Sequence, residues 1–167
     1  MRAKMAVYFI ADNENPKYDV LRVKIGISGN IERRVKELQT GSPVKLKLMG
    51  WIESEDARAL ERNLHKKYCA KHTHLEWFEL SSSDVLEELK WHSTNSYIVT
   101  NDDVFKVISF DRKGIPEYIE SWQWADCDDS EFCPNCGWGG GLTFNENYCG
   151  DYCIECGFAP AFLSNND

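Results

Sequence analysis

The amino-acid sequence predicts an α+β fold followed by a small part built around a metal. Three observations lead to this fold class. A strand, a tight turn and a helix follow one another over Leu21 to Leu38, an alternating strand pattern with a second helix comes next, and two pairs of cysteines stand near the C-terminus. We therefore expect strands and helices packed around one core, and cysteines that hold the C-terminal part together.

The first two strands are expected close to the N-terminus. Ala6 to Ala11 is a compact apolar run, typical of a buried strand, and Leu21 to Ile27 forms a second strand after a turn-rich connection. Two strands joined by a short loop favour an antiparallel hairpin, which would bring Tyr8 near Lys24.

The turn at Ser28-Gly29-Asn30 leads into the first helix. Asn30 is a good N-cap residue, and Gly41 follows the last turn. The buried stripe of this helix consists of Ile31, Val35 and Leu38. Arg34 lies on the same side as that stripe, whereas Arg33 faces solvent. Either Arg34 meets an anion, or its stem packs on the core and its charged head reaches water.

A half-buried strand over Val44 to Ser54 precedes the second helix, which Ser54 is expected to cap. Its apolar stripe consists of Ala57, Leu60, Leu64 and Tyr68. Glu61 lies in the middle of the stripe, and His65 follows one turn later. A carboxylate there needs a cation, a metal or a raised pKa, and an internal ion pair with Arg34 is one alternative. The outward side, either solvated or phosphate-contacting, carries Arg58, Arg62, Lys66, Lys67 and Lys71.

Tyr8, Arg34 and Glu61 form a set that suits phosphodiester hydrolysis. Tyrosine can move a proton to or from a water, arginine binds a phosphate, and glutamate can hold a divalent cation whose other ligands are water and phosphate. The set resembles the GIY-YIG nuclease superfamily, with Ala6-Val7-Tyr8 at the first motif and Lys24-Ile25-Gly26 at the second. Over residues 5–82 the chain is similar to the branch of phage open-reading-frame domains related to a meiotically up-regulated yeast gene product.

This resemblance implies a small three-stranded antiparallel sheet flanked by helices, and DNA cleavage with one Mg²⁺ or Mn²⁺ ion. It places the catalytic arginine at Arg34 and the metal-binding glutamate at Glu61. Lys24 stands where the family has a second tyrosine, and it can orient a phosphate or lower the pKa of Tyr8. His65 is the candidate for an assisting histidine.

The C-terminal part contains two similar turns, Cys133-Pro-Asn-Cys136-Gly and Cys153-Ile-Glu-Cys156-Gly. Each can present two thiolates, so four cysteines can close a tetrahedral Zn²⁺ site with no open position for catalysis. We therefore expect a structural zinc ribbon over residues 126–167. The alternatives are reduced cysteines in a small core, or a redox pair. The nuclease-like domain is expected over residues 1–92. Residues 93–125, which join it to the ribbon, are expected to form a β-hairpin connector whose turn is Asp111 to Gly114.

The charge of the chain is uneven. Residues 1–92 hold 16 Lys and Arg against 14 Asp and Glu, a net of +2, whereas residues 93–167 hold 3 against 13, a net of −10. The first part can therefore approach a polyanion, and the acidic second part can contact a protein partner. With neither a signal peptide nor a membrane-spanning run, we expect a cytoplasmic protein, in a bacterial or phage-infected cell given the phage character of the resemblance.

These observations predict a metal-dependent endonuclease that acts on double-stranded DNA, with a zinc ribbon that aids target or partner recognition. The alternative is a catalytically inactive module of the same fold that binds nucleic acid or a protein. A third possibility, an acidic protein that mimics DNA, rests on the charge asymmetry alone.

Overall fold

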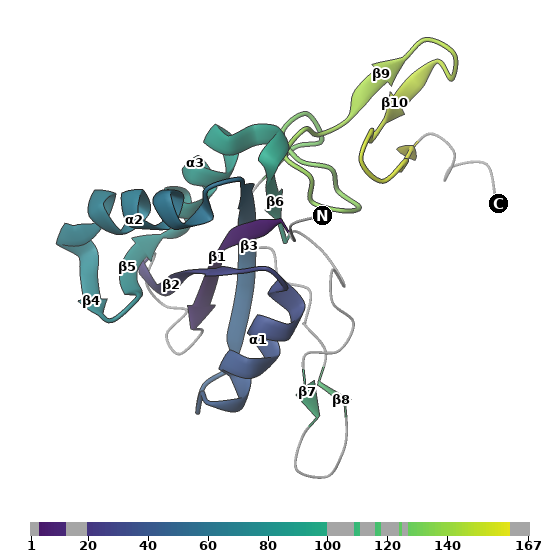
Figure 1. Cartoon of the computed structure of the whole chain (residues 1–167). Helices are drawn as coiled ribbons and strands as arrows, with labels where there is room; N and C mark the ends of the chain where they lie inside the picture. Colours follow the sequence, from purple (N-terminus) through teal and green to yellow (C-terminus); the bar gives the residue numbers. More distant parts are fainter. Residues whose placement is uncertain are drawn as a thin grey trace.

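A six-stranded antiparallel sheet forms the centre of the structure, a computed structural model that describes residues 4–12, 20–99, 109–110, 116–117, 124 and 127–160 (Figure 1). Its strand order is β4-β5-β2-β1-β3-β6. The strands are β1 (Met5–Asp12), β2 (Val20–Ser28), β3 (Leu46–Ser54), β4 (His72–His74), β5 (Trp77–Ser81) and β6 (Ser96–Ile98). The expected hairpin is present, because β1 pairs with β2 from Ala6 opposite Ser28 to Asp12 opposite Arg22. The α+β class is therefore confirmed.

The predicted number of three strands is wrong. The strands β2, β1 and β3 are only the middle of the sheet. The segment after the second helix contains β5, which pairs with β2, and β6, from the range predicted as connector, pairs with β3. Both additions satisfy backbone groups that a three-stranded sheet would leave open at its edges.

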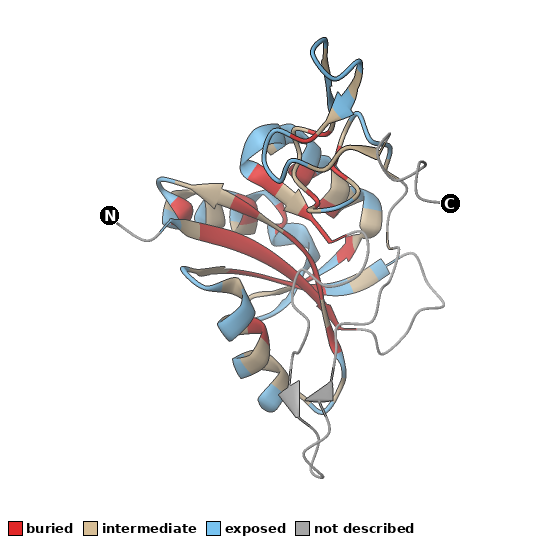
Figure 2. Cartoon of the chain, turned by 90° about the vertical axis from the view of Figure 1, so that its right-hand side faces the viewer, coloured by how far each residue is buried: buried red, intermediate tan, exposed pale blue. Residues whose placement is uncertain are grey.

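Helices cover the two faces of the sheet unequally. One face carries α1 (Ile31–Thr40), and the other carries α2 (Ala57–Lys67) and α3 (Ser82–His92). Figure 2 shows the buried residues of the central strands lying between these helices. Because strand side chains alternate, Val7 and Phe9 pack towards α2 and α3, whereas Tyr8 and Ile10 pack towards α1. The site residues on β1 therefore belong to the thinner, α1-covered face.

The helix starts follow local capping rules, with one correction. Asn30 caps α1 as predicted, since its side chain accepts the backbone N–H of Arg33 at 2.9 Å. The predicted Ser54 cap of α2 is wrong, because Ser54 ends β3 and Asp56 accepts the N–H of Ala59 at 3.0 Å. Two short helices, η1 (Cys69–Lys71) and η2 (Ser93–Asn95), lead into β4 and β6. None of the helices in the described ranges has the length and apolar character needed to cross a membrane.

The C-terminal cysteine-containing part packs on the edge of the sheet at β6. The N–H of Ile98 donates to the carbonyl of Gly137 at 2.8 Å, and the N–H of Gly139 donates to Ser96 at 2.9 Å. The two-stranded sheet of β9 (Thr143–Asn145) and β10 (Gly150–Tyr152) lies between the two cysteine turns. Within the predicted connector, β7 (Ser109–Phe110) pairs with β8 (Pro116–Glu117), and the predicted turn between them lies outside the described residues.

Candidate active site

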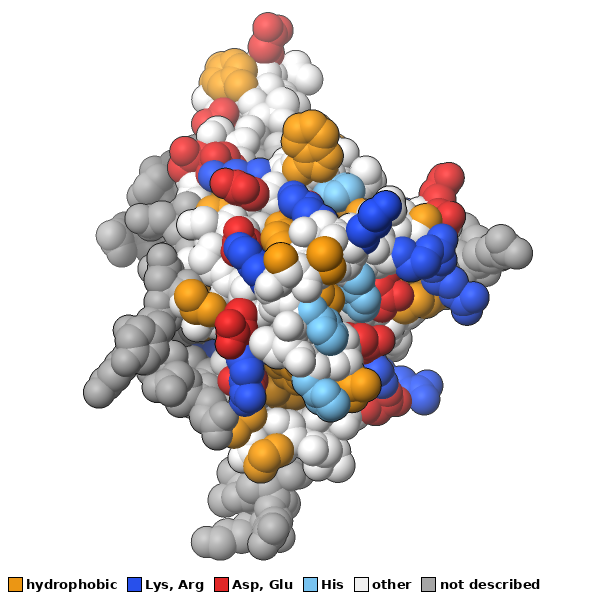
Figure 3. Space-filling view, turned by 90° about the vertical axis from the view of Figure 1, so that its left-hand side faces the viewer, with side chains coloured by type: hydrophobic (Ala, Val, Ile, Leu, Met, Phe, Trp, Pro, Cys, Tyr) orange, Lys and Arg blue, Asp and Glu red, His pale blue; other side chains and the backbone are white. Residues whose placement is uncertain are grey.

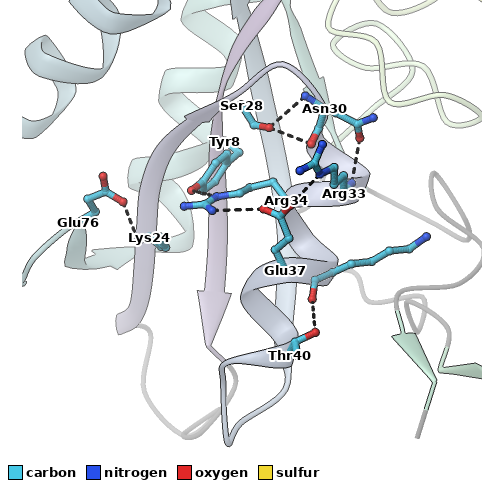
Figure 4. Close-up of polar contacts among 10 residues, drawn as sticks. Tyr8, Lys24, Ser28, Asn30, Arg33, Arg34, Glu37, Thr40 and Glu76 are labelled. Atoms are coloured by element: carbon cyan, nitrogen blue, oxygen red, sulfur yellow. Dashed lines mark hydrogen bonds and ion pairs between the residues drawn. The ribbon is translucent and has the colours of Figure 1, made fainter.

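Tyr8 and Arg34 meet on the α1-covered face of the sheet. Tyr8 is fully buried on β1, and Nε–H of Arg34 donates to its hydroxyl oxygen at 3.3 Å (Figure 4). Arg34 is half-buried, and its Nη1 also lies 3.5 Å from a carboxylate oxygen of Glu37, one turn further along α1. Helix periodicity therefore predicted correctly that Arg34 lies on the inward side of α1. Its partners there are the phenol of Tyr8 and the exposed carboxylate of Glu37 on the same helix.

Gly26 leaves the space that the Tyr8 hydroxyl occupies. It stands opposite Tyr8 in the β1–β2 pairing. A Cβ at this position would lie 2.4 Å from the hydroxyl oxygen and 2.7 Å from Cζ of the ring, so any larger residue would collide with Tyr8. The glycine of the second motif thus lets the phenol lie across β2 and reach the edge of that strand.

Lys24 lies two residues before Gly26 on the same face of β2. Its side chain is 10% exposed, and Nζ donates to Glu76 at 2.6 Å (Figure 4). The ammonium also lies 5.7 Å from the ring centroid of Trp77, the residue paired with Lys24 across β2 and β5. The carboxylate and the aromatic ring offset the loss of water around the buried lysine side chain.

Glu61 and His65 approach from α2 on the other face, at the part of β2 that β5 does not cover. On the side of β5 the strand pairing of β2 ends at Lys24, and the N–H of Ile25 donates to the carbonyl of Glu76 at 3.0 Å; beyond this point only β1 pairs with β2. His65 fills part of this gap: its Nε2 lies 2.9 Å from the carbonyl of Ile25 and must carry the proton, since a carbonyl only accepts. Half-buried Glu61 is one turn earlier, with neither a hydrogen bond nor an ion pair in the described chain.

The pKa values reflect this partial burial. Burial raises the pKa of the Tyr8 phenol, while the hydrogen bond and charge of Arg34 oppose the rise. Burial also raises the pKa of the Glu61 carboxyl, against which His65 acts. Lys24 lowers the pKa of Glu61, and Glu76 raises the pKa values of both Glu61 and Tyr8. The five residues singled out in the sequence, Tyr8, Lys24, Arg34, Glu61 and His65, therefore surround one stretch of β2, although no direct contact joins Glu61 to Tyr8 or Arg34 among the residues described.

Two features of the site were missed or left open at the level of sequence. Glu76, which forms an ion pair with Lys24, was not singled out, although a buried charged lysine needs such a partner. The alternative of an Arg34–Glu61 ion pair is not observed, because Arg34 turns to Tyr8 and Glu37. The first outcome depends on the pairing of β5 with β2, and the second on which face of the sheet each helix covers.

The outward side of α2 is basic, as predicted. Lysine, arginine and histidine side chains gather on the face of the molecule shown in Figure 3. The exposed Lys67 and Lys71 form ion pairs with Glu88 and Asp84 of α3. Arg58, Arg62 and Lys66 are exposed and have no ion pair within the described part of the chain, so these three charges remain available to solvent or to an anion.

The four predicted cysteine ligands come together. Sγ of Cys133 lies 3.8 Å from Sγ of Cys156, the Cys136–Cys153 pair has the same separation, and all four sulfur atoms lie within 4.8 Å of one another. A tetrahedral site with zinc–sulfur bonds of about 2.3 Å needs sulfur–sulfur distances of about 3.8 Å. The sulfur positions therefore fit a Zn²⁺ ion.

Each cysteine turn closes around a glycine with a left-handed backbone. The N–H of Gly137 donates to the carbonyl of Cys133 at 2.8 Å, and Gly157 does the same to Cys153 at 2.8 Å. Their φ angles are 76° and 75°, a region that glycine adopts without strain. The repeated C-x2-C-G pattern thus specifies both turns locally.

Comparison with known proteins gives a family for the larger part of the chain. No match was found among curated proteins or among solved structures. The T5orf172 domain matches residues 5–93, which is 89 of the 167 residues and includes every strand and helix around the candidate active site. That domain is related to GIY-YIG-like and phage open-reading-frame nuclease domains, which indicates a nuclease-like or DNA-binding module. The chain therefore belongs to the T5orf172 domain family.

Proposed function

We propose that this protein is a metal-dependent endonuclease of the GIY-YIG type that hydrolyses phosphodiester bonds in double-stranded DNA. One observation carries the proposal: Arg34 donates to the hydroxyl of Tyr8, and the half-buried Glu61, which has no hydrogen bond within the described chain, is close enough for its charge to raise the pKa of Tyr8. A guanidinium, a phenol and an unengaged carboxylate are the groups that a phosphate, an attacking water and a hard cation need.

Each site residue has its own role in the hydrolysis. The oxygen of water forms a bond to phosphorus, and one phosphorus–oxygen ester bond breaks. Tyr8 polarises the water or, as phenolate, accepts its proton, and the charge of Arg34 lowers the free energy of that phenolate. Arg34 also binds the scissile phosphate. Lys24 positions Tyr8 and the phosphate, and His65 assists by holding the backbone of Ile25 beside Glu61.

The chemistry of Glu61 fits Mg²⁺ or Mn²⁺. Such ions commonly bind one or two carboxylates and complete their shell with water and phosphate oxygens. Among the described residues, the four cysteines are the only group of three or more side chains that could bind a metal ion together. Glu61 would therefore be the one protein side chain that binds the Mg²⁺ or Mn²⁺ ion. When bound, the ion would offset negative charge on the phosphate.

A structural zinc ribbon over residues 126–167 completes this proposal. Its four cysteines leave no position open for catalysis. Because residues 93–167 carry a net charge of −10, the ribbon contributes to target choice through specific contacts or a protein partner, not through nonspecific attraction to DNA. The division into residues 1–92, 93–125 and 126–167, and a cytoplasmic location, are parts of the same proposal.

A DNA-binding module without turnover is the second candidate. It is favoured by Lys24, which stands in place of a second phenol and whose ammonium is engaged by Glu76. Burial also raises the pKa of Tyr8, which keeps the phenol protonated near neutral pH. Such a module would bind duplex DNA in a salt-dependent way and never cut it.

Cleavage of supercoiled plasmid by the zinc-replete full chain with Mg²⁺ or Mn²⁺ separates the two candidates. The endonuclease predicts nicking or linearisation that is lost in Glu61→Ala and Arg34→Ala. Two matched controls should cut like the wild type: Arg33→Ala, the neighbouring arginine whose side chain is 78% exposed, and Glu87→Ala, an exposed acid on α3. Salt-dependent binding without any cleavage would leave the binding module as the function.

A further inference from the structure

A cavity of about 490 Å³ adjoins the candidate active site on the α1-covered face. It lies between the end of α1 with the loop that follows it and the strands β2, β4 and β5. One of its lining residues, Lys24, is itself a site residue, and another, Glu37, forms an ion pair with the site residue Arg34. The residues Lys24 and Gly26 are two positions apart on β2, which corresponds to about 7 Å along the strand. One nucleotide can span that distance.

The charges in the cavity disfavour a second phosphate. Arg22 forms an ion pair with Asp12, and Lys24 forms one with Glu76, so each of these two cations already has a carboxylate partner. The lining also contains the Glu37 carboxylate, which would repel an anion. A neutral ligand needs no free cation and is not repelled by the Glu37 carboxylate.

The walls of the cavity suit a flat aromatic ligand. Leu38, Val44 and the half-buried indole of Trp77 provide apolar surface. The exposed His74, which pairs with Trp77 across β4 and β5, brings its imidazole to the same cavity. The imidazole of His74 makes no hydrogen bond within the described part of the chain, so it can bond to the edge of a ligand that stacks on the indole. Volumes of this size are ordinary for small-molecule sites.

We propose that this cavity binds a nucleobase of an unpaired or flipped nucleotide next to the scissile phosphate, with the base stacked on Trp77. The inference rests on the proposed function, because it takes Arg34 as the phosphate ligand. It narrows the substrate class: the preferred DNA has a base that can leave the duplex beside the cut. Stacking on an aromatic side chain tolerates any base, and the edge contacts from His74 discriminate among bases.

The test uses oligonucleotides that carry 2-aminopurine, a fluorescent base whose emission falls when it stacks on an aromatic ring. One duplex holds it as a single unpaired base, and a second holds it fully paired. The zinc-replete full chain is added without Mg²⁺ or Mn²⁺, and binding is followed separately by the anisotropy of an end label. Binding should quench the emission of the unpaired base. The affinity for that duplex should be about fivefold or more higher than for the paired duplex, because fivefold corresponds to the smallest free energy found for stacking one base on an aromatic side chain.

Three variants make the test specific. Trp77→Leu removes the stacking surface, and Gly41→Leu adds a bulky non-aromatic side chain at a position that lines the cavity, where a Cβ meets only the carbonyl of Leu38 at 3.9 Å. Both should abolish the quenching and the preference. Trp91→Leu, which alters a tryptophan that is 84% exposed on α3, should leave both unchanged.

The outcomes separate this inference from the proposed function. Unchanged emission in the wild type, equal affinity for the two duplexes, or quenching that survives Gly41→Leu overturns the base site, even if plasmid is cut. Quenching that Trp77→Leu and Gly41→Leu abolish supports the base site, even if the protein never cuts plasmid and the endonuclease proposal fails.

Discussion

Replacing Gly26 by alanine tests the geometry around Tyr8 most directly. The added Cβ would lie 2.4 Å from the hydroxyl oxygen of Tyr8, whereas an ordinary contact is 3.4–4 Å, so the hydroxyl must move by about 1 Å. The ring is fully buried and cannot move freely. We expect the hydrogen bond from Arg34, already 3.3 Å long, to be lost. A misplacement of about 1 Å lowers catalytic rates by about 100-fold, and overpacking of this kind destabilises by about 1–3 kcal/mol.

Two measurements check this prediction. Initial rates of plasmid cleavage report the activity, and urea denaturation reports the free energy of unfolding. Val20→Ala, at an exposed position of the same strand, is the control and should change neither by much. If Gly26→Ala cuts at the wild-type rate, the hydroxyl of Tyr8 does not need its position across β2, and its assigned role in hydrolysis is wrong.

Three further predictions concern ionisation and zinc. Arg34→Gln removes the hydrogen bond and charge that lower the pKa of Tyr8, so phenolate absorption of this residue should emerge at higher pH than in the wild type; an unchanged or lower titration would contradict the contact. Burial raises the pKa of Glu61 and His65 lowers it, so in the metal-free protein the Glu61 carboxyl should titrate, by NMR, at a higher pH than an ordinary glutamate carboxyl, and His65→Ala should raise its pKa further; a carboxyl that titrates like an ordinary glutamate would contradict this burial. Cys136→Ser should abolish binding of one zinc ion per chain, measured by atomic absorption, and lower the thermal midpoint of the sheet, because the first cysteine turn is bonded to β6; a zinc-free variant with the wild-type midpoint would refute that coupling.

Local patterns of the sequence determined the elements that carry the site. Helix periodicity put Arg34 on the inward side of α1, and side-chain chemistry put a cap at Asn30. The C-x2-C-G spacing specified two identical turns, because each turn closes within five residues. These features depend on neighbours in the chain, which is why the residue order alone was sufficient.

Contacts between distant residues were decided only by the tertiary structure. Lys24 and Glu76 are 52 positions apart, and no local pattern states which acid meets a buried lysine. The addition of β5 and β6 to the central strands, and the early end of β5 that leaves part of β2 uncovered for Glu61 and His65, arise from pairing between separated segments. Such pairing is selected by the burial of whole faces and the satisfaction of strand edges, which act only once the chain is folded.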